Sequence, residues 1–354
     1  MTTDFILQLT KHSERQKILI LTLLGCLLVA CTILSISVGP VSVGINSIIL
    51  GLKKSVGLSE TIDNEALIVE AIRLPRTILG LAVGFALGVS GAALQGLFRN
   101  PLVDPSLIGV SAGGALGAAF WILIGQTFGF LAILDPSIMT PIFAFVGSIL
   151  ILFAIYKIGS KSGYISVTVM LLAGIALNAI AGALLGIMIF ASDDFQLRAI
   201  NFWTLGSIAG GNISTHAPAM ILAIISSFII LFDCRNLNLL MLGETEAKNL
   251  GCEIHVIKRR ILTLCAISTA AAVSVSGIIG FIGLVAPHLI RLLASSDNKL
   301  VLPGSGLLGA ILILVADMTA RLLVQPAELP LGVMTAIFGA PFFIWLLIKK
   351  RGSL

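Results

Sequence analysis

Long apolar runs recur along the whole chain and constrain its fold more than any other feature. A helix needs about 20 mainly apolar residues to cross the hydrocarbon core of a bilayer. Runs of this kind predict ten spans, at residues 17–39, 74–98, 106–125, 139–157, 163–191, 217–232, 260–276, 278–294, 304–324 and 331–348. Only 11% of the 354 residues are charged, whereas soluble domains carry about 25%. We therefore predict an all-α polytopic membrane protein with about ten transmembrane helices.

The distribution of Lys and Arg predicts the orientation, because basic residues concentrate in cytoplasmic loops. With the N-terminus inside, 16 of the 22 basic residues are cytoplasmic, and the six outer ones are Lys53, Lys54, Arg73, Arg76, Arg198 and Arg321. This division predicts two cytoplasmic termini, a cytoplasmic tail over 1–16 and one transmembrane domain over 17–350. The first apolar run is longer than a signal-peptide core and no small-x-small cleavage site follows it, so we expect an uncleaved span.

The net charge of +5 describes inner loops that face anionic lipid, and nothing in the pattern favours nucleic acid. The five cysteines include no Cys-x-x-Cys, which argues against a disulfide framework or a zinc site. We therefore expect no metal and no cofactor bound by this chain.

Two series of glycines at four-residue spacing predict close packing between helices. They are Gly80, Gly84 and Gly88 in one span, and Gly109, Gly113 and Gly117 in the next. A phosphate-binding loop is the alternative, but neither series follows a strand and the chain contains no Gly-Lys dipeptide. The chain is therefore not expected to be an enzyme, and any ATPase must be another polypeptide.

Ionisable residues are rare within the spans. Asp317 lies four residues before Arg321, which predicts a helical ion pair, and a proton relay is the alternative.

Three arginines lie at the outer side. The sequence Arg73-Leu74-Pro75-Arg76 predicts an extended approach and then a helix start, and Arg321 ends the ninth span on the same side. These guanidiniums either dock carboxylates of a soluble partner or snorkel to lipid headgroups.

Two cytoplasmic segments also break the apolar pattern. The turn at 99–105 contains two prolines and is either a rigid loop or a gate contact. The long loop at 233–260 is predicted to carry a short helix, stopped by Gly251, with Glu244 paired to Lys248 and with Ala247 and Leu250 on one face. This segment either docks a partner protein or is a loop with no binding role.

An outer segment over 192–203 mixes aromatic and polar residues, among them Phe202 and Trp203. It suits either the mouth of a pathway or an interfacial anchor.

Several motifs in order resemble a known family. They are Arg-Leu-Pro-Arg at 73–76, the run at 94–102, the Gly-Val-Ser at 109–111, the Leu-Gly-Glu loop at 242–251, the run at 280–288, and the segment from Glu-Leu-Pro at 328 to Gly-Ala-Pro at 341. Together they resemble the FecCD permeases of type II bacterial ABC importers, which import ferric siderophores, heme and vitamin B12. The resemblance covers about residues 66–350, and the first 65 residues carry little of it.

The resemblance implies roles for particular residues. It implies that Arg73, Arg76 and Arg321 meet acidic residues of a periplasmic substrate-binding protein. The residues implied to couple the permease to the ATPase are Gly243, Glu244, Ala247, Leu250 and Gly251. Those implied to gate the inner end are Asn100 and Leu102, with a second gate at Ser166, Val167 and Thr168.

The resemblance also implies the assembly and the cargo. The expected partners are an ABC ATPase dimer, the binding protein, membrane lipid, and a second permease copy or paralogue, in the bacterial inner membrane. The expected cargo is an iron chelate, either a ferric siderophore or heme. The alternatives are vitamin B12 import, a proton-coupled secondary transporter that needs Asp317, or a membrane scaffold.

Overall fold

The computed structural model describes residues 2–41, 43–55, 57–58, 63–127, 134–161, 164–324 and 327–351. Most of the described chain is helical, with turns and loops between the helices. The strands among the described residues form one two-stranded antiparallel hairpin, β1 (Ser160–Lys161) and β2 (Tyr164–Ile165).

The helices follow one another with short connections. Their bounds are α1 (Thr2–Ser37), α2 (Ile45–Ser55), α3 (Asn64–Ile68), the π-helix η1 (Val69–Arg73), α4 (Leu74–Phe98), the 3₁₀ helix η2 (Pro105–Ile108), α5 (Val110–Thr127), α6 (Pro136–Gly159), α7 (Val167–Phe190), α8 (Asp194–Leu205), α9 (Ile213–Leu231), α10 (Cys234–Leu242), α11 (Glu244–Asn249), α12 (Ile254–Ser276), α13 (Ile282–Leu293), α14 (Asn298–Leu323) and α15 (Leu331–Arg351).

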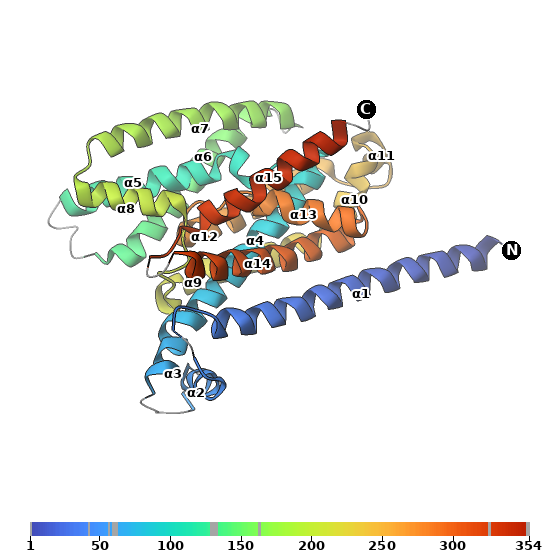
Figure 1. Ribbon diagram of the computed structural model, residues 1–354. Helices are drawn as coiled ribbons and strands as arrows, with labels where there is room; N and C mark the ends of the chain where they lie inside the picture. The colour runs from blue at the N-terminus through green and yellow to red at the C-terminus, as the bar shows by residue number, and fades with distance from the viewer. Residues whose placement is uncertain are drawn as a thin grey trace.

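Each predicted span overlaps one helix, namely α1, α4, α5, α6, α7, α9, α12, α13, α14 or α15. Six helical stretches of the described chain are long and apolar enough to cross a membrane by themselves, and α5, α13 and α15 are shorter apolar helices. The first helix begins and the last helix ends at the same side of the bundle, where α10 and α11 also lie (Figure 1). We call this the inner end and the opposite end, with α2, α3 and α8, the outer end, following the predicted orientation.

Most predicted helix starts differ from the structure by several residues, and at two of them turn chemistry overrides the apolar pattern. The span predicted at 163–191 begins only at Val167, because the β-hairpin occupies the preceding residues and Ser166 caps the helix. The span predicted at 278–294 begins at Ile282, since Gly277 and Phe281 have φ angles of 67° that interrupt the helix. The helix α13 is therefore only 12 residues long.

The extended approach predicted before Pro75 is wrong. The chain is helical from Asn64 through η1 into α4, and Arg73 and Leu74 both have right-handed helical angles. Pro75 lies in the first turn of α4, directly after the π-helical turn η1. The α-helix α4 begins at Leu74 as predicted, but the continuous helical stretch that could cross a membrane begins at Asn64.

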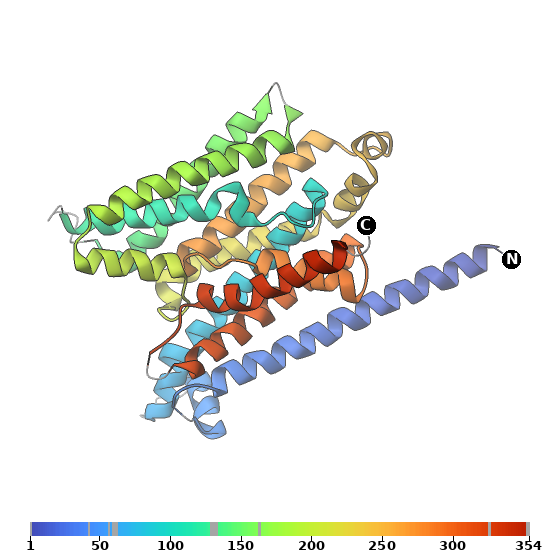
Figure 2. The same cartoon turned by 45° about the horizontal axis from the view of Figure 1, so that its top comes forward.

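The core of the bundle is built around α4, which is buried along almost its whole length. It runs beside α14 in both views (Figure 2), and the two backbones touch. A Cβ atom on Gly84 would lie 2.5 Å from the Gly309 carbonyl oxygen, and one on Gly88 would overlap the Ser305 carbonyl oxygen. The predicted packing role of this glycine series is confirmed.

The second glycine series packs α5 against α6. A Cβ atom on Gly113 would lie 2.5 Å from the Gly147 carbonyl oxygen, and one on Gly117 would overlap the Phe143 carbonyl oxygen. Gly109 has a different role, because its φ of 78° forms the turn between η2 and α5.

Gly84→Ala is expected to destabilise the folded chain by about 2 kcal/mol, because α4 and α14 must move apart to admit the methyl group. Gly25→Ala is the matched control, since a Cβ atom on Gly25 of α1 meets nothing within 4 Å. Thermal unfolding in detergent measures both variants. Equal thermal midpoints would contradict the packing assignment.

Candidate functional site

A buried ion cluster joins the outer ends of α4 and α14. Both Nε and Nη2 of Arg76 donate to Oδ1 of Asp317, at 2.9 and 2.7 Å. The other carboxylate oxygen of Asp317 lies 3.1 Å from Nη2 of Arg321. The predicted ion pair between Asp317 and Arg321 is therefore confirmed, and Arg76 enlarges it.

A second carboxylate reaches Arg76 from the segment between α14 and α15. Nη1 of Arg76 donates to both carboxylate oxygens of Glu328, at 2.9 and 2.8 Å. We call Arg73, Arg76, Asp317, Arg321 and Glu328 the outer charge network.

The remaining arginine donors hold the end of α1. Nη1 of Arg73 donates to the carbonyls of Ile36 and Ser37, at 2.8 and 2.6 Å. Arg321 donates to the carbonyls of Ser35 and Val38, at 3.2 Å each. The carbonyls at a helix C-terminus lack helical partners and carry partial negative charge, so two guanidiniums stabilise this helix end.

The structure places the three predicted docking residues inside the protein. Arg73, Arg76 and Arg321 are 3%, 5% and 4% exposed. Snorkelling to lipid headgroups is therefore wrong, because each guanidinium faces protein acceptors. Docking of a soluble protein stays a prediction from the resemblance. It requires one of these arginines to release an acceptor within the chain and to bind a carboxylate of the soluble protein instead.

Sequence reasoning missed Glu328 and the α1 carbonyls as partners. Glu328 is 252 residues from Arg76 along the chain, and no local pattern marks the contact. The only available signal was the presence of both residues in segments predicted to lie on one side of the membrane.

At the inner end, α10 and α11 form the predicted coupling loop. The predicted short helix is confirmed as α11, and the glycines that bound it have positive φ angles, 135° at Gly243 and 83° at Gly251. Ala247 is fully buried, whereas Leu250 is 61% exposed, so the expectation that they share a face is wrong. Together with Leu242, which is 65% exposed, Leu250 gives the inner end an apolar surface.

The predicted pairing of Glu244 with Lys248 is also wrong. Oε1 of Glu244 accepts a hydrogen bond from Nζ of Lys258 at 2.7 Å, and Arg99 lies 3.9 Å away. Lys258 reaches Glu244 because α12 packs beside α11 in the fold, which a helical spacing rule cannot predict.

The predicted inner gate turn follows α4 directly. Arg99 ends α4 with a left-handed φ of 49°, and Oδ1 of Asn100 accepts a hydrogen bond from the Leu102 amide at 3.0 Å. Leu102 is 39% exposed. Buried Gln95 donates to the carbonyls of Val103 and Gly283, so the turn is tied to α13.

The second predicted gate lies at the start of α7. The side chain of Ser166 caps the helix by accepting from the Val169 amide at 3.4 Å. Val167 is half-buried and Thr168 is exposed. The role of these residues and of the turn at Asn100 as gates stays a prediction.

A polar junction at Lys17, within the first half of α1, holds this helix against Asp297 and the predicted coupling loop. Asp297 accepts hydrogen bonds from Lys17 of α1 at 2.5 Å and from Asn238 of α10 at 2.6 Å. Burial raises the pKa of Asp297, but hydrogen bonds from Lys17, the Lys299 amide and Asn238 outweigh it and hold the pKa below its usual value. The stabilisation by Asp297 is therefore present at neutral pH and lost as the pH falls through the lowered pKa.

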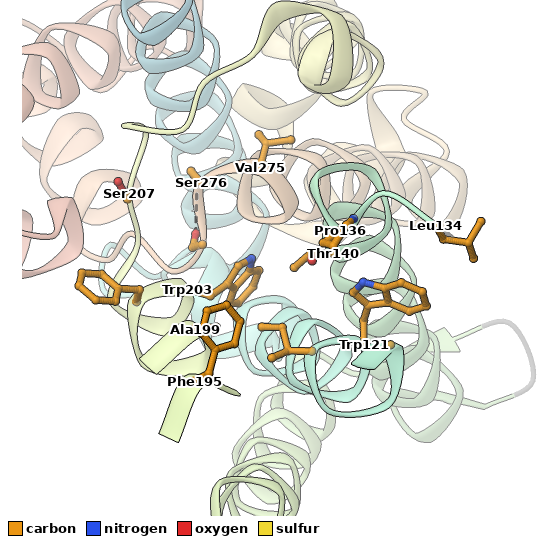
Figure 3. Close-up of a pocket in the computed structure, with 14 residues that line it drawn as sticks. Trp121, Leu134, Pro136, Thr140, Phe195, Ala199, Trp203, Ser207, Val275 and Ser276 are labelled. Atoms are coloured by element: carbon orange, nitrogen blue, oxygen red, sulfur yellow. Dashed lines mark hydrogen bonds between the residues drawn. The ribbon is translucent and has the colours of Figure 1, made fainter. Parts of the chain in front are cut away.

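A pocket of about 570 Å³ opens beside the amphipathic helix α8 (Figure 3). Its walls include Phe195 and Trp203 of α8, Trp121 of α5, Thr140 of α6 and Ser276 of α12. The predicted aromatic segment at 192–203 is thus a helix with one face on a pocket at the outer end. Among the described residues, no three His, Cys, Asp or Glu side chains are grouped so that they could hold a metal ion.

Comparison with known proteins identifies the family. The sequence pattern of the FecCD transport family matches residues 27–349. The chain belongs to the FecCD transport family. The match begins within α1, so the expectation that the first 65 residues carry little of the resemblance is corrected.

The relatives of this FecCD chain are permeases. The hemin transport system permease HmuU of Yersinia pestis is 45% identical over 280 residues, which cover 79% of this chain and 83% of the relative. The cobalamin import permease BtuC of Halobacterium salinarum is 37% identical over 299 residues, covering 83% and 76%. The vitamin B12 import permease BtuC of Citrobacter koseri is 41% identical over 285 residues, covering 80% and 84%.

A solved structure supports the fold. It shows an inward-facing conformation of a transporter assigned to the metal-chelate type of ABC transporters. Its TM-score is 0.79 at 32% sequence identity, and the match covers 93% of this chain and 99% of that chain. This FecCD protein is therefore a multi-pass membrane permease of the ABC importer type, a class that works with an ATPase and a binding protein.

Asp317→Asn is expected to destabilise this FecCD permease by about 3 kcal/mol, because it leaves the buried Arg76 and Arg321 without their shared charge. The comparison variant is Glu70→Gln, which breaks the more exposed pair with Lys54. Thermal midpoints in detergent measure both. A Glu70→Gln loss as large as that of Asp317→Asn would show that burial of the network does not matter.

Proposed function

We propose that this FecCD permease forms, with a second copy of itself, the transmembrane pathway of an ATP-driven importer for an iron chelate, either heme or a ferric siderophore. In this proposal it lies in the bacterial inner membrane with both termini in the cytoplasm. The observation that carries the proposal is the 45% identity to a hemin permease over 79% of this chain, together with the structural match to a metal-chelate-type transporter.

Vitamin B12 import is the second candidate, because the cobalamin and vitamin B12 permeases are 37–41% identical over a similar length. The proton-coupled carrier loses its main support, since Asp317 is bound by two arginines and only 1% exposed. A carboxylate held in this way stabilises the fold and is poorly placed to exchange protons.

The inner end supports coupling to an ATPase. The exposed Leu242 and Leu250 flank α11 and give a partner an apolar surface to cover. Glu244, Lys258 and Arg99 connect this helix to α12 and to the gate turn, so a displacement of α11 would reach the end of α4.

An exposed face of α7 supports pairing with a second copy of the permease. Gly182 and Gly186 lie four residues apart, and a Cβ atom on either would meet nothing within 4 Å. Small residues at this spacing let helices approach closely in a membrane. The glycines of α4 and α5 are already covered by helices of the same chain, whereas these two are open to a partner.

The test is uptake into proteoliposomes that contain the permease with its partner ATPase and binding protein. We expect ATP-dependent accumulation of heme or of a ferric siderophore in preference to vitamin B12. Leu250→Glu is expected to reduce uptake at least tenfold without loss of folded permease, because it places a charge in the ATPase contact. Leu58→Glu, at an exposed residue of the outer loop, is the matched control. Accumulation without ATP would contradict the proposal.

A separate test addresses the second copy. With the native cysteines replaced, Gly186→Cys is expected to give a disulfide-linked dimer in oxidised membranes, because α7 would lie against its symmetry mate. Gly25→Cys, on the open face of α1, is expected to stay monomeric. Equal cross-linking of the two variants would argue against α7 as the contact.

A further inference from the structure

The two carboxylates bound to Arg76 differ in how firmly they are held. Asp317 lies within α14, its side chain is 1% exposed, and it bridges Arg76 and Arg321. Glu328 lies on the segment between α14 and α15, and its side chain is 37% exposed. The described contacts of the Glu328 carboxylate are with Nη1 of Arg76. Glu328 can therefore leave without disturbing the rest of the network, whereas Asp317 cannot.

The other two arginines of the network are already occupied. Arg73 and Arg321 donate to the carbonyls at the end of α1, and Arg321 also faces Asp317. Withdrawing either one would leave carbonyls at the C-terminal end of α1 without their donors. Arg76 is thus the arginine that can bind an outside carboxylate at the lowest cost, because only its hydrogen bonds to Glu328 need to be exchanged.

We propose that Glu328 is an internal placeholder on Arg76, which an acidic side chain of the soluble delivery protein displaces when it docks. An incoming carboxylate would accept the same two Nη1 hydrogen bonds and replace the same negative charge. The exchange costs little net free energy, because one partly exposed ion pair replaces another. This inference rests on the proposed function, since it takes the delivery protein as the partner.

Displacement of Glu328 would also affect the segment before α15 and, through it, the end of α8. Glu328 is three residues before Leu331, where α15 begins. The amide of Leu331 donates to the Gly206 carbonyl at 2.9 Å, at the end of α8 beside the outer pocket. Release of Glu328 would therefore free the segment that leads into α15 and that touches the end of α8.

The test measures the reactivity of Arg76 toward phenylglyoxal, which modifies accessible guanidiniums, in the full-length permease in lipid nanodiscs. Glu328→Gln is expected to raise the rate of Arg76 modification about fivefold, the change that loss of a partly exposed ion pair supports. A tetraglutamate peptide, as the carboxylate probe, is expected to slow modification in Glu328→Gln more than in the unaltered chain. Glu70→Gln removes a different outer carboxylate and is expected to leave the Arg76 rate unchanged.

Three outcomes would overturn the placeholder role. An unchanged Arg76 rate in Glu328→Gln would show that Glu328 does not shield the guanidinium. No protection by the peptide would make the bond to Glu328 purely structural. Modification of the buried Arg321 together with Arg76 would show general opening of the outer end. The assay needs neither cargo nor ATPase, so its failure leaves the importer proposal standing, and a failure of uptake leaves its result unaffected.

Discussion

The direct contact between the backbones of α4 and α14 is the constraint on which the rest of the structure depends. These helices are antiparallel and touch where Gly84 faces Gly309. Arg76 lies eight residues from Gly84 toward the outer end, and Asp317 lies eight residues from Gly309 in the same direction. Equal steps of about 1.5 Å per residue along the two helices bring the guanidinium and the carboxylate to the same height. The glycines therefore set the geometry of the outer charge network.

The outer charge network in turn attaches helix α1 to the bundle. Helix α1 is exposed along much of its length, and its outer end is held by Arg73 and Arg321. Nearer its middle, α1 is held by Lys17 on Asp297. Charged groups at two points thus fix a helix that offers few buried apolar contacts, in an environment where lipid gives no hydrophobic reason for association.

Helix α4 also runs from one end of the bundle to the other. Arg76 lies in its first turn at the outer network, and Gln95 and Arg99 lie at its other end, at the predicted gate turn and near the predicted coupling helix. Because α4 is buried on nearly every side, it can move only together with the helices packed on it. Such an element suits rigid-body motion.

Much of the fold followed from local patterns. Apolar length predicted a helix at each of the ten runs, six of which lie in described stretches long and apolar enough to span a membrane by themselves. The four-residue glycine spacing predicted which faces pack closely. Turn chemistry shifted several helix ends, as at Phe281, where a non-glycine residue adopts a left-handed angle that the apolar pattern cannot reveal. The Glu244 pairing failed for a similar reason, because Lys258 on another helix outcompetes the local Lys248.

The sequence by itself determined that this chain spans a membrane, which faces of its helices pack, and which family it belongs to, because length, spacing and motif order are properties of contiguous residues. The tertiary structure alone decided that the outer arginines are internally bound, that Glu328 covers Arg76, and that Leu250 faces outward while Ala247 faces in. Those facts depend on contacts between residues far apart in the chain. Such contacts exist only once α4, α14 and the segment before α15 have been brought together by packing.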